Sequence, residues 1–418
     1  MYNVWFYLII ALFILDFFWE QFLEYLNRTR MNPLMPKELD GIYDSEKYAK
    51  QQAYQKENSR FNTVSDGFMF IIGLTFLWHG GIGWLDELLR RYIDVDILLS
   101  VSFFWSISFA TWIISIPFDW YNTFVIEQKF GFNTTTPRTF VTDKVKELSL
   151  TLILISIVIS ILAAAYKYIG NYSWLWAWFA VVTFSLIILF FYSEWIVPIF
   201  NKQTPLEEGE LREAIEAYAQ KADFPIQNIY VIDGSKRSTK SNAYFTGFGG
   251  KKRIVLYDTL KNDLNTEEIV AILAHEIGHY KKKHIIYRIA ISFMSIGFWL
   301  WLLTLFLDNP QIAYALGGRV ASLHLSIIGF SLLYSPLSEL LNFATNCLSR
   351  RDEYAADNFA ATYGTGEALI TALKKISSKA LSNLTPHPFV VFWTHSHPTL
   401  LQRMRNIESN KSHSNKDY

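Results

Sequence analysis

Residues Thr266–His279 read TEEIVAILAHEIGH and contain the pattern H-E-x-x-H at His275, Glu276 and His279. On a helix, a spacing of four places both histidines on one face, where two neutral imidazoles can hold one Zn²⁺. Glu276 then lies beside the first histidine, in position to take a proton from a water that the metal activates. The pattern therefore predicts a zinc protease that carries one Zn²⁺ per chain.

The residues around this motif favour a helix. Asn265 and Glu268 have the spacing of a capping box, which satisfies the first backbone N–H groups of a helix. Apolar residues recur at helical spacing, and Lys281–Lys283 suit the negative C-terminal end of the helix dipole. We predict a single helix over residues 266–284.

Two histidines do not complete a catalytic zinc site, which takes three protein ligands and leaves one position open. The polar segment 346–357 follows a long apolar stretch, and it places Glu353 and Asp357 on one helix face. One carboxylate can bind the metal while the other accepts a hydrogen bond from a ligand histidine. Spacing favours Glu353 slightly and leaves both assignments open.

The composition places this chemistry in a membrane. The chain has 418 residues, of which 51% are hydrophobic, and its apolar residues come in blocks long enough to cross a bilayer. We predict an all-α polytopic membrane protein whose seven spans lie near residues 4–24, 68–86, 97–118, 148–166, 174–197, 286–307 and 320–343. The first block contains acids and ends without small residues, so we expect it to remain as a span rather than to be cleaved as a signal peptide.

Two of these spans contain ionisable residues, namely Asp16, Glu20, His324 and Glu339. Such groups cost free energy in lipid, so we expect them to face protein or an internal aqueous space. For Glu20 and Glu339, a position at the membrane interface is an equal alternative.

The distribution of lysine and arginine predicts the orientation. With seven spans, residues 25–67, 119–147, 198–285 and 344–418 share one side of the membrane, and that side carries nearly all of the Lys and Arg. The positive-inside rule places the protease motif in the cytoplasm. The formal net charge is zero and there is no basic nucleic-acid motif, so nucleic acid is not an expected partner. Cys347 is the single cysteine, and we interpret it as an inert thiol.

A small α+β zinc-protease insertion is predicted between the fifth and sixth spans. Residues 208–221 have the pattern of an amphipathic helix, residues 228–232 and 253–257 are expected strands, and residues 235–250 form a glycine-rich connection. The predicted regions are the first five spans at 1–197, the insertion at 198–285, the last two spans at 286–345, and the rest of the protease domain at 346–418.

The connection contains a candidate for substrate binding. Asn242, Ala243 and Tyr244 precede the second strand, and an extended segment near a zinc helix can hold a peptide by backbone pairing. An ordinary aromatic hairpin explains this segment equally well.

Several blocks of residues resemble the type I CAAX prenyl protease family, whose members are integral-membrane zinc metalloproteases of the gluzincin group. Besides H-E-x-x-H, the blocks are Gly41–Asp44, Asn58–Phe61, Phe130–Asn133, Pro198–Leu206, Ser241–Phe248, Ser349–Asp357 and Ser396–Pro398. The resemblance runs along nearly the whole chain. It implies that the seven helices form a barrel around a water-filled chamber that the zinc site faces.

The resemblance also implies roles for individual residues. It assigns Glu276 to catalysis, His397 to a transition-state or substrate contact, and Arg403 to the support of that contact. It implies that Glu353 is the third zinc ligand, beside His275 and His279. Asp357 is then expected to accept a hydrogen bond from a ligand histidine. The implied substrates are peptides or prenylated CAAX proteins, which family members cut near the C-terminus, and the lipid bilayer is the expected surrounding.

Two departures from the family affect the expected source and substrate. Thr134–Pro137 replaces a usual lysine and glutamine, and the connection between the last two spans is short, as in bacterial or plant members. We expect the plasma membrane if the source is a bacterium and the endoplasmic reticulum membrane if it is a eukaryote. A bacterium lacks prenylated CAAX proteins, so a quality-control protease that cuts damaged membrane proteins is the nearer alternative. A transport or binding protein with a structural metal site is the more distant one, and the intact Glu276 argues against it.

Overall fold

Seven helices dominate the fold. The computed structural model describes residues 2–32, 34–224, 226, 228–246, 253–307 and 309–414. Among these residues, seven helices are long and apolar enough to cross a membrane, and each predicted span overlaps one of them. They are α1 (Val4–Arg28), α2 (Ser45–Trp78), α4 (Asp96–Tyr121), α6 (Pro137–Ile169), α7 (Ser173–Phe191), α12 (His284–Thr304) and α14 (Leu323–Thr362).

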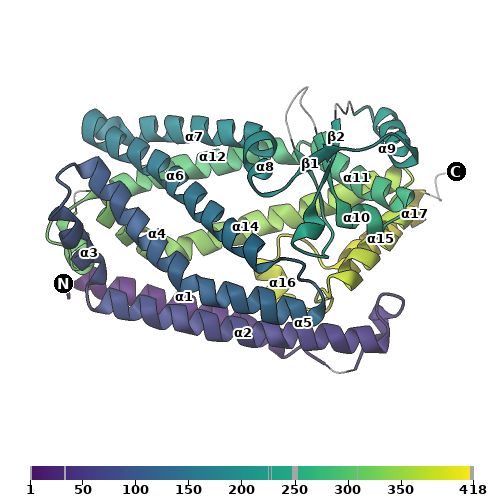
Figure 1. Cartoon of the computed structure of the whole chain (residues 1–418), viewed down its shortest axis with the longest axis horizontal. Coiled ribbons are helices and arrows are strands. Elements are labelled where there is room, and N and C mark those ends of the chain that lie inside the picture. The colour runs from purple at the N-terminus through teal and green to yellow at the C-terminus, as the bar shows by residue number, and fades with distance from the viewer. Residues whose placement is uncertain are drawn as a thin grey trace.

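Two of these helices continue through a turn of π-helix. Helix α4 passes through η2 (Asn122–Glu127) into α5 (Gln128–Phe130), and α7 passes through η4 (Tyr192–Ile196) into α8 (Val197–Phe200). Each continuation keeps the candidate span unbroken as far as Phe130 or Phe200. In Figure 1, α5 and α8 lie at the ends of their helices that are nearest the soluble part of the protein. The loops that follow α5 and α8 start there.

The seven helices are arranged as a closed ring. Helix α4 packs on α6, α6 on α7, α7 on α12, α12 on α14, α14 on α1 and α1 on α2, and α2 returns to the π-helical end of α4. In Figure 1, α1 with α2 and α7 with α12 form opposite edges. At most 22% of the most apolar window of any span is buried inside the protein. Low burial is expected for helices whose outer faces contact lipid, and the order of contacts around the ring agrees with the expected barrel.

The predicted span over residues 68–86 was placed too far along the chain. Helix α2 begins at Ser45, where the Asp44 carboxylate caps the Lys47 amide, and it ends at Trp78. Gly80 then adopts a positive φ of 68° and starts the separate helix α3 (Gly81–Arg90). Glycine accepts this left-handed conformation without a steric penalty, so the chain turns inside the predicted span.

The soluble part lies at one end of the ring, together with the C-terminal helices (Figure 1). Its sheet has the order β1-β2-β4-β3, in which β2 and β4 are parallel and the other pairs are antiparallel. The strands are β1 (Gln203–Pro205), β2 (Asn228–Ile232), β3 (Ala243–Thr246) and β4 (Arg253–Tyr257). The predicted strands 228–232 and 253–257 are confirmed, whereas Gly247–Gly250 of the predicted connection lie outside the described residues.

Short helices surround the sheet and close the two ends of the ring. Besides α3 they are α9 (Glu210–Lys221), α10 (Asp258–Asp263), α11 (Thr266–Lys281), α13 (Pro310–Ala315), α15 (Gly366–Lys379), α16 (Pro388–Thr394) and α17 (Leu400–Ser414). Leu256 of the sheet, Leu260 of α10, Ile269 and Leu273 of α11 and Ala372 of α15 are buried in one core. This core fixes α11 between the sheet and the C-terminal helices.

The helix that carries H-E-x-x-H is shorter than predicted. The capping box of Asn265 and Glu268 is present, but the helix ends at Lys281 rather than at residue 284. Lys283 has a φ of 59°, and α12 begins at His284. The polar lysines continue the helical pattern through this break, so periodicity could not reveal it. The break allows α11 to lie on the sheet while α12 enters the ring.

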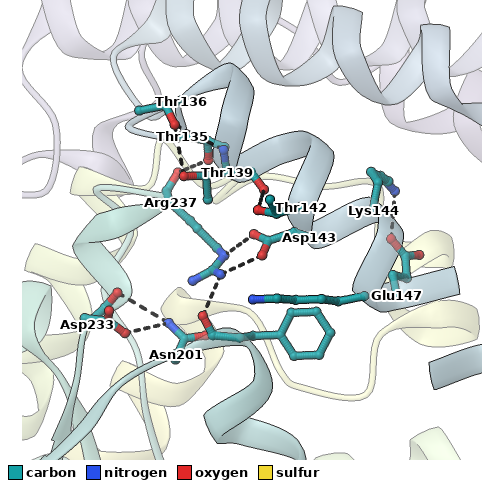
Figure 2. Close-up of polar contacts among 12 residues, drawn as sticks. Thr135, Thr136, Thr139, Thr142, Asp143, Lys144, Glu147, Asn201, Asp233 and Arg237 are labelled. Atoms are coloured by element: carbon teal, nitrogen blue, oxygen red, sulfur yellow. Dashed lines mark hydrogen bonds and ion pairs between the residues drawn. The ribbon is translucent and has the colours of Figure 1, made fainter. Parts of the chain in front are cut away.

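A polar cluster joins the soluble part to the membrane helices (Figure 2). Arg237 follows β2, and its guanidinium donates from Nε and Nη2 to the two carboxylate oxygens of Asp143 on α6, at 2.7 and 2.9 Å. The same Nη2 donates to the Phe200 carbonyl at the end of α8, at 2.7 Å. Asn201 donates to the Asp233 carboxylate at 3.1 Å. One side chain therefore connects the sheet to two spans.

The ionisable residues of the spans lie against other polar groups. His324 on α14 is fully buried, and its ring nitrogens lie 2.7 Å from an Asp86 oxygen and 3.1 Å from the Ser100 hydroxyl. His324 therefore faces protein, as expected. Asp16 accepts a hydrogen bond from Ser335 on α14. The carboxylates of Asp16 and Glu339 lie near enough to Glu20 to interact with it electrostatically.

Candidate metal centre and active site

The centre is built where α11 crosses α14. Gly278 lies at the crossing, and a Cβ atom at that position would meet the backbone of Ala356 at 3.1 Å. The absence of a side chain lets the two helices approach closely. Glu353 and Asp357 lie one turn apart on α14, both are buried, and both reach His275 on α11. The sequence prediction that both carboxylates share one face is confirmed.

Three side chains present ligand atoms to one point. His275 Nε2 lies 3.1 Å from His279 Nε2 and 3.4 Å from an oxygen of Glu353, and His279 Nε2 lies 3.2 Å from the other oxygen of Glu353. These groups form a cluster that could hold a metal ion, since the ligand atoms lie within 4.8 Å of one another. Ligands about 2.0–2.1 Å from a tetrahedral zinc lie roughly 3.3 Å apart, so the spacing fits Zn²⁺.

The hydrogen bonds of His275 orient its metal-binding nitrogen. Its Nδ1 lies 2.8 Å from an Asp357 oxygen, which can only accept, so Nδ1 carries the proton and Nε2 presents its lone pair to the cluster. The facing oxygen, Glu353 Oε2, is buried and has no hydrogen-bond partner. A cation satisfies both acceptors at once.

In the absence of a metal, a proton on His275 can neutralise part of the negative charge at this point. Burial by itself lowers the pKa of His275, but the neighbouring carboxylates of Asp357 and Glu353 outweigh it and raise that pKa to about 9. A metal that binds there must therefore displace a proton at neutral pH, because only the neutral imidazole is a ligand.

The other predicted site residues surround this cluster. Arg403 on α17 donates to both oxygens of Asp357, from Nη2 at 2.6 Å and from Nε at 2.9 Å. His397 Nε2 lies 3.4 Å from Glu353 Oε1. Glu276 and His397 both line a cavity of about 350 Å³ that is also lined by His275, His279 and Glu353. The structure thus brings together every residue predicted for catalysis and metal binding.

The outer strand of the sheet borders the same cavity. Asn242 and Ala243 line it, while Tyr244 is not among the lining residues and its ring lies near that of Tyr257. The Asn242 carbonyl accepts from the Tyr257 amide at 3.1 Å, and Tyr244 pairs with Val255 of β4. Alternate residues of an antiparallel strand turn their backbone groups outward, so Ala243 presents its N–H and C=O away from β4.

One contact of the centre was missed from the sequence. His284, the first residue of α12, places its Nδ1 2.9 Å from Nδ1 of His279, and its Nε2 lies 3.7 Å from Asp352. The sequence does show a third histidine, His284, five residues after His279. The prediction of one unbroken helix through residue 284 concealed it, because such a helix does not turn residues 279 and 284 toward each other.

Comparisons with known proteins agree with this geometry. The family model for the CAAX prenyl protease N-terminal region with five membrane helices matches residues 24–202, and the model for peptidase family M48 matches residues 205–411. The chain is 33% identical to the CAAX prenyl protease 1 homolog of Homo sapiens, over 95% of this chain and 94% of that protein. It is 32% identical to CAAX prenyl protease 1 of Saccharomyces cerevisiae, over 94% and 93%. The crystal structure of S. mikatae Ste24p superimposes with a TM-score of 0.91 at 30% identity, covering 98% of this chain and 100% of that one.

Proposed function

The chain belongs to the CAAX prenyl protease 1 family of M48 peptidases, and from this premise we propose that it is a zinc endopeptidase for CAAX proteins. It is a multi-pass membrane metalloprotease. We propose that His275, His279 and Glu353 hold one zinc ion. The observation that supports this assignment is the convergence of His275 Nε2, His279 Nε2 and the buried Glu353 carboxylate, whose ligand atoms lie within 4.8 Å of one another.

The proposed mechanism uses three parts of the chain. A bound zinc supplies Lewis acidity that polarises the scissile carbonyl and makes water more acidic. Glu276 takes a proton from the attacking water and returns it to the leaving amine. His397 can donate a hydrogen bond to the developing oxyanion, because its exposed ring lies at the edge of the cavity. The outward backbone of Ala243 can hold the substrate in an extended conformation.

We propose that Asp357 and Arg403 position the centre, with Asp357 outside the lining of the cavity and Arg403 at its wall. Asp357 fixes the tautomer of His275, and Arg403 fixes Asp357 by two hydrogen bonds. Loss of a side chain that hydrogen-bonds to a metal ligand typically weakens metal binding by 10–100-fold. We expect Asp357→Asn to weaken zinc binding by about this factor, measured by competition with a chelator of known affinity. Asp94→Asn, in an exposed loop, is the control, and an unchanged zinc affinity in Asp357→Asn would contradict this role.

The substrate class is tested by direct cleavage. Purified protein is given matched peptides that end in CAAX, one farnesylated and one unmodified, and mass spectrometry locates the cut. We expect the farnesylated peptide to be cut after its cysteine and the reaction to stop when zinc is chelated. Equal cutting of both peptides at many positions would instead favour a quality-control protease of membrane proteins.

We further propose that the centre works on the cytoplasmic side of the membrane. The loops that share its side carry nearly all of the Lys and Arg of the chain, as the positive-inside rule requires. The membrane would be the plasma membrane in a bacterium and the endoplasmic reticulum membrane in a eukaryote.

A further inference from the structure

A second cavity adjoins the catalytic one inside the ring. It measures about 430 Å³ and is lined by residues of α12 and α14, together with Ser396, which precedes His397. Arg288 lines both cavities and therefore lies at their boundary. Among the described residues that line the second cavity, Arg288 is the one side chain with a charge at neutral pH. Most of the other lining groups are hydroxyls, amides and apolar surfaces, among them Ser292, Trp299, Ser338, Leu341 and Asn342.

The contacts of Arg288 leave part of its guanidinium available. Its Nε and Nη2 lie 2.8 and 2.7 Å from the same oxygen of Asp352, a buried residue that precedes Glu353 in sequence. The side chain of Arg288 is nevertheless 40% exposed. A guanidinium has five N–H donors and can engage carboxylates along more than one edge. Asp352 occupies the Nε edge and holds the group in place, the Ser349 carbonyl lies 3.5 Å from Nη2, and the Tyr287 hydroxyl also interacts with the group, so a second anion would approach the remaining exposed part of the guanidinium.

We propose that Arg288 binds the free C-terminal carboxylate of the substrate, and that the second cavity receives the side chain of the last substrate residue. This inference rests on the proposed function, because it concerns a substrate cut close to its own C-terminus. Three extended residues span about 10 Å. A cation that holds the carboxylate at a fixed place in the catalytic cavity would fix how many residues lie between the C-terminus and the scissile bond.

Electrostatics supports an anion at this place. In the catalytic cavity, the proposed zinc, Arg403 and the carboxylates of Glu276 and Glu353 already offset one another, so they leave little net charge for a second anion. A substrate carboxylate that has left water needs a charge-assisted partner to offset its lost hydration. Arg288 is a cation at the boundary of the two cavities. Arg403 already donates hydrogen bonds to both oxygens of Asp357. The uncharged lining beyond Arg288 suits an uncharged side chain on the last residue of a CAAX terminus.

The test compares two peptides that differ only in their last group, a free carboxylate or a carboxamide. We expect wild-type protein to cut the acid about tenfold or more faster than the amide, measured as kcat/KM, because charged hydrogen bonds are strong ones. Arg288→Gln should bring the ratio of kcat/KM for the acid to that for the amide down to about one. Arg288→Lys, which keeps the charge but not the planar fork, should retain part of the preference.

The ratio of the two rates is independent of how much of a preparation is active, so partial misfolding of a variant does not hide the result. Arg319→Gln makes the same change of charge at an exposed residue paired with Glu87 and should keep the wild-type ratio. Equal cutting of both peptides by wild-type protein, or an unchanged ratio in Arg288→Gln, would overturn the assignment of Arg288 alone. Wild-type protein that contains zinc and cuts neither peptide would overturn the proposed function, and this inference with it.

Discussion

Replacement of His275, His279 or Glu353 by alanine is expected to remove zinc and peptide hydrolysis together. Each side chain supplies one of three ligand atoms that converge on one point, and two ligands bind zinc far more weakly than three. A catalytic metal contributes several kcal/mol to transition-state stabilisation, so its loss should lower kcat by roughly 10³-fold or more. Zinc content by elemental analysis and cleavage of a CAAX peptide are measured on the same sample.

The control for the histidine variants is His79→Ala, which changes an exposed histidine at the end of α2, far along the chain from the centre. It should keep one zinc per chain and full activity. A ligand variant that retains a full zinc content would remove that residue from the proposed set. A variant that loses zinc but still hydrolyses the peptide would contradict a metal-dependent reaction.

Replacement of Glu276 by glutamine is expected to separate catalysis from metal binding. Glu276 lines the catalytic cavity beside His275 and His279, but it is not part of the cluster that could hold a metal. Glutamine has nearly the same shape and cannot accept the proton, so we expect kcat to fall by about 10²–10⁴-fold while zinc stays at one per chain. The measurement pairs single-substrate kinetics with metal analysis.

Two results would argue against this role of Glu276. Activity close to that of wild type in Glu276→Gln would show that another group acts as the base. Loss of zinc from the same variant would make Glu276 a contributor to the metal site rather than a base. Restoration of part of the activity by Glu276→Asp, which keeps a carboxylate on a shorter side chain, would support proton transfer at this position.

Local sequence patterns predicted the elements that depend on neighbouring residues. The capping box at Asn265 and Glu268, the strands Asn228–Ile232 and Arg253–Tyr257 and the approximate spans are all present. Each depends on periodicity or on contacts three or four residues apart. The break at Lys283 was not predicted, because the flanking lysines continued the helical pattern, and the turn at Gly80 was missed although the pair Gly80 and Gly81 is a turn signal.

The arrangement of the site could be predicted only in part. The spacing of Glu353 and Asp357 placed them on one helix face, but it could not determine which one reaches Nε2 of His275 and which one reaches Nδ1. That choice depends on where α14 crosses α11, and the crossing is set by the close approach at Gly278. The resemblance to a known family supplied what spacing could not. The contact between His279 and His284 depends on the break between two helices, and local pattern does not contain it.

The order in which the ligands occur along the chain has a consequence for biosynthesis. His275 and His279 lie on α11, before the last two membrane helices, whereas Glu353 lies near the far end of α14, a single helix of 40 residues. A nascent chain therefore emerges from the ribosome with two histidines and no third ligand until the final membrane segment has been made. Copies that stall or are truncated before Glu353 lack a complete centre. With these three residues as the proposed ligands, the metal site would become complete only after the last membrane segment has been made.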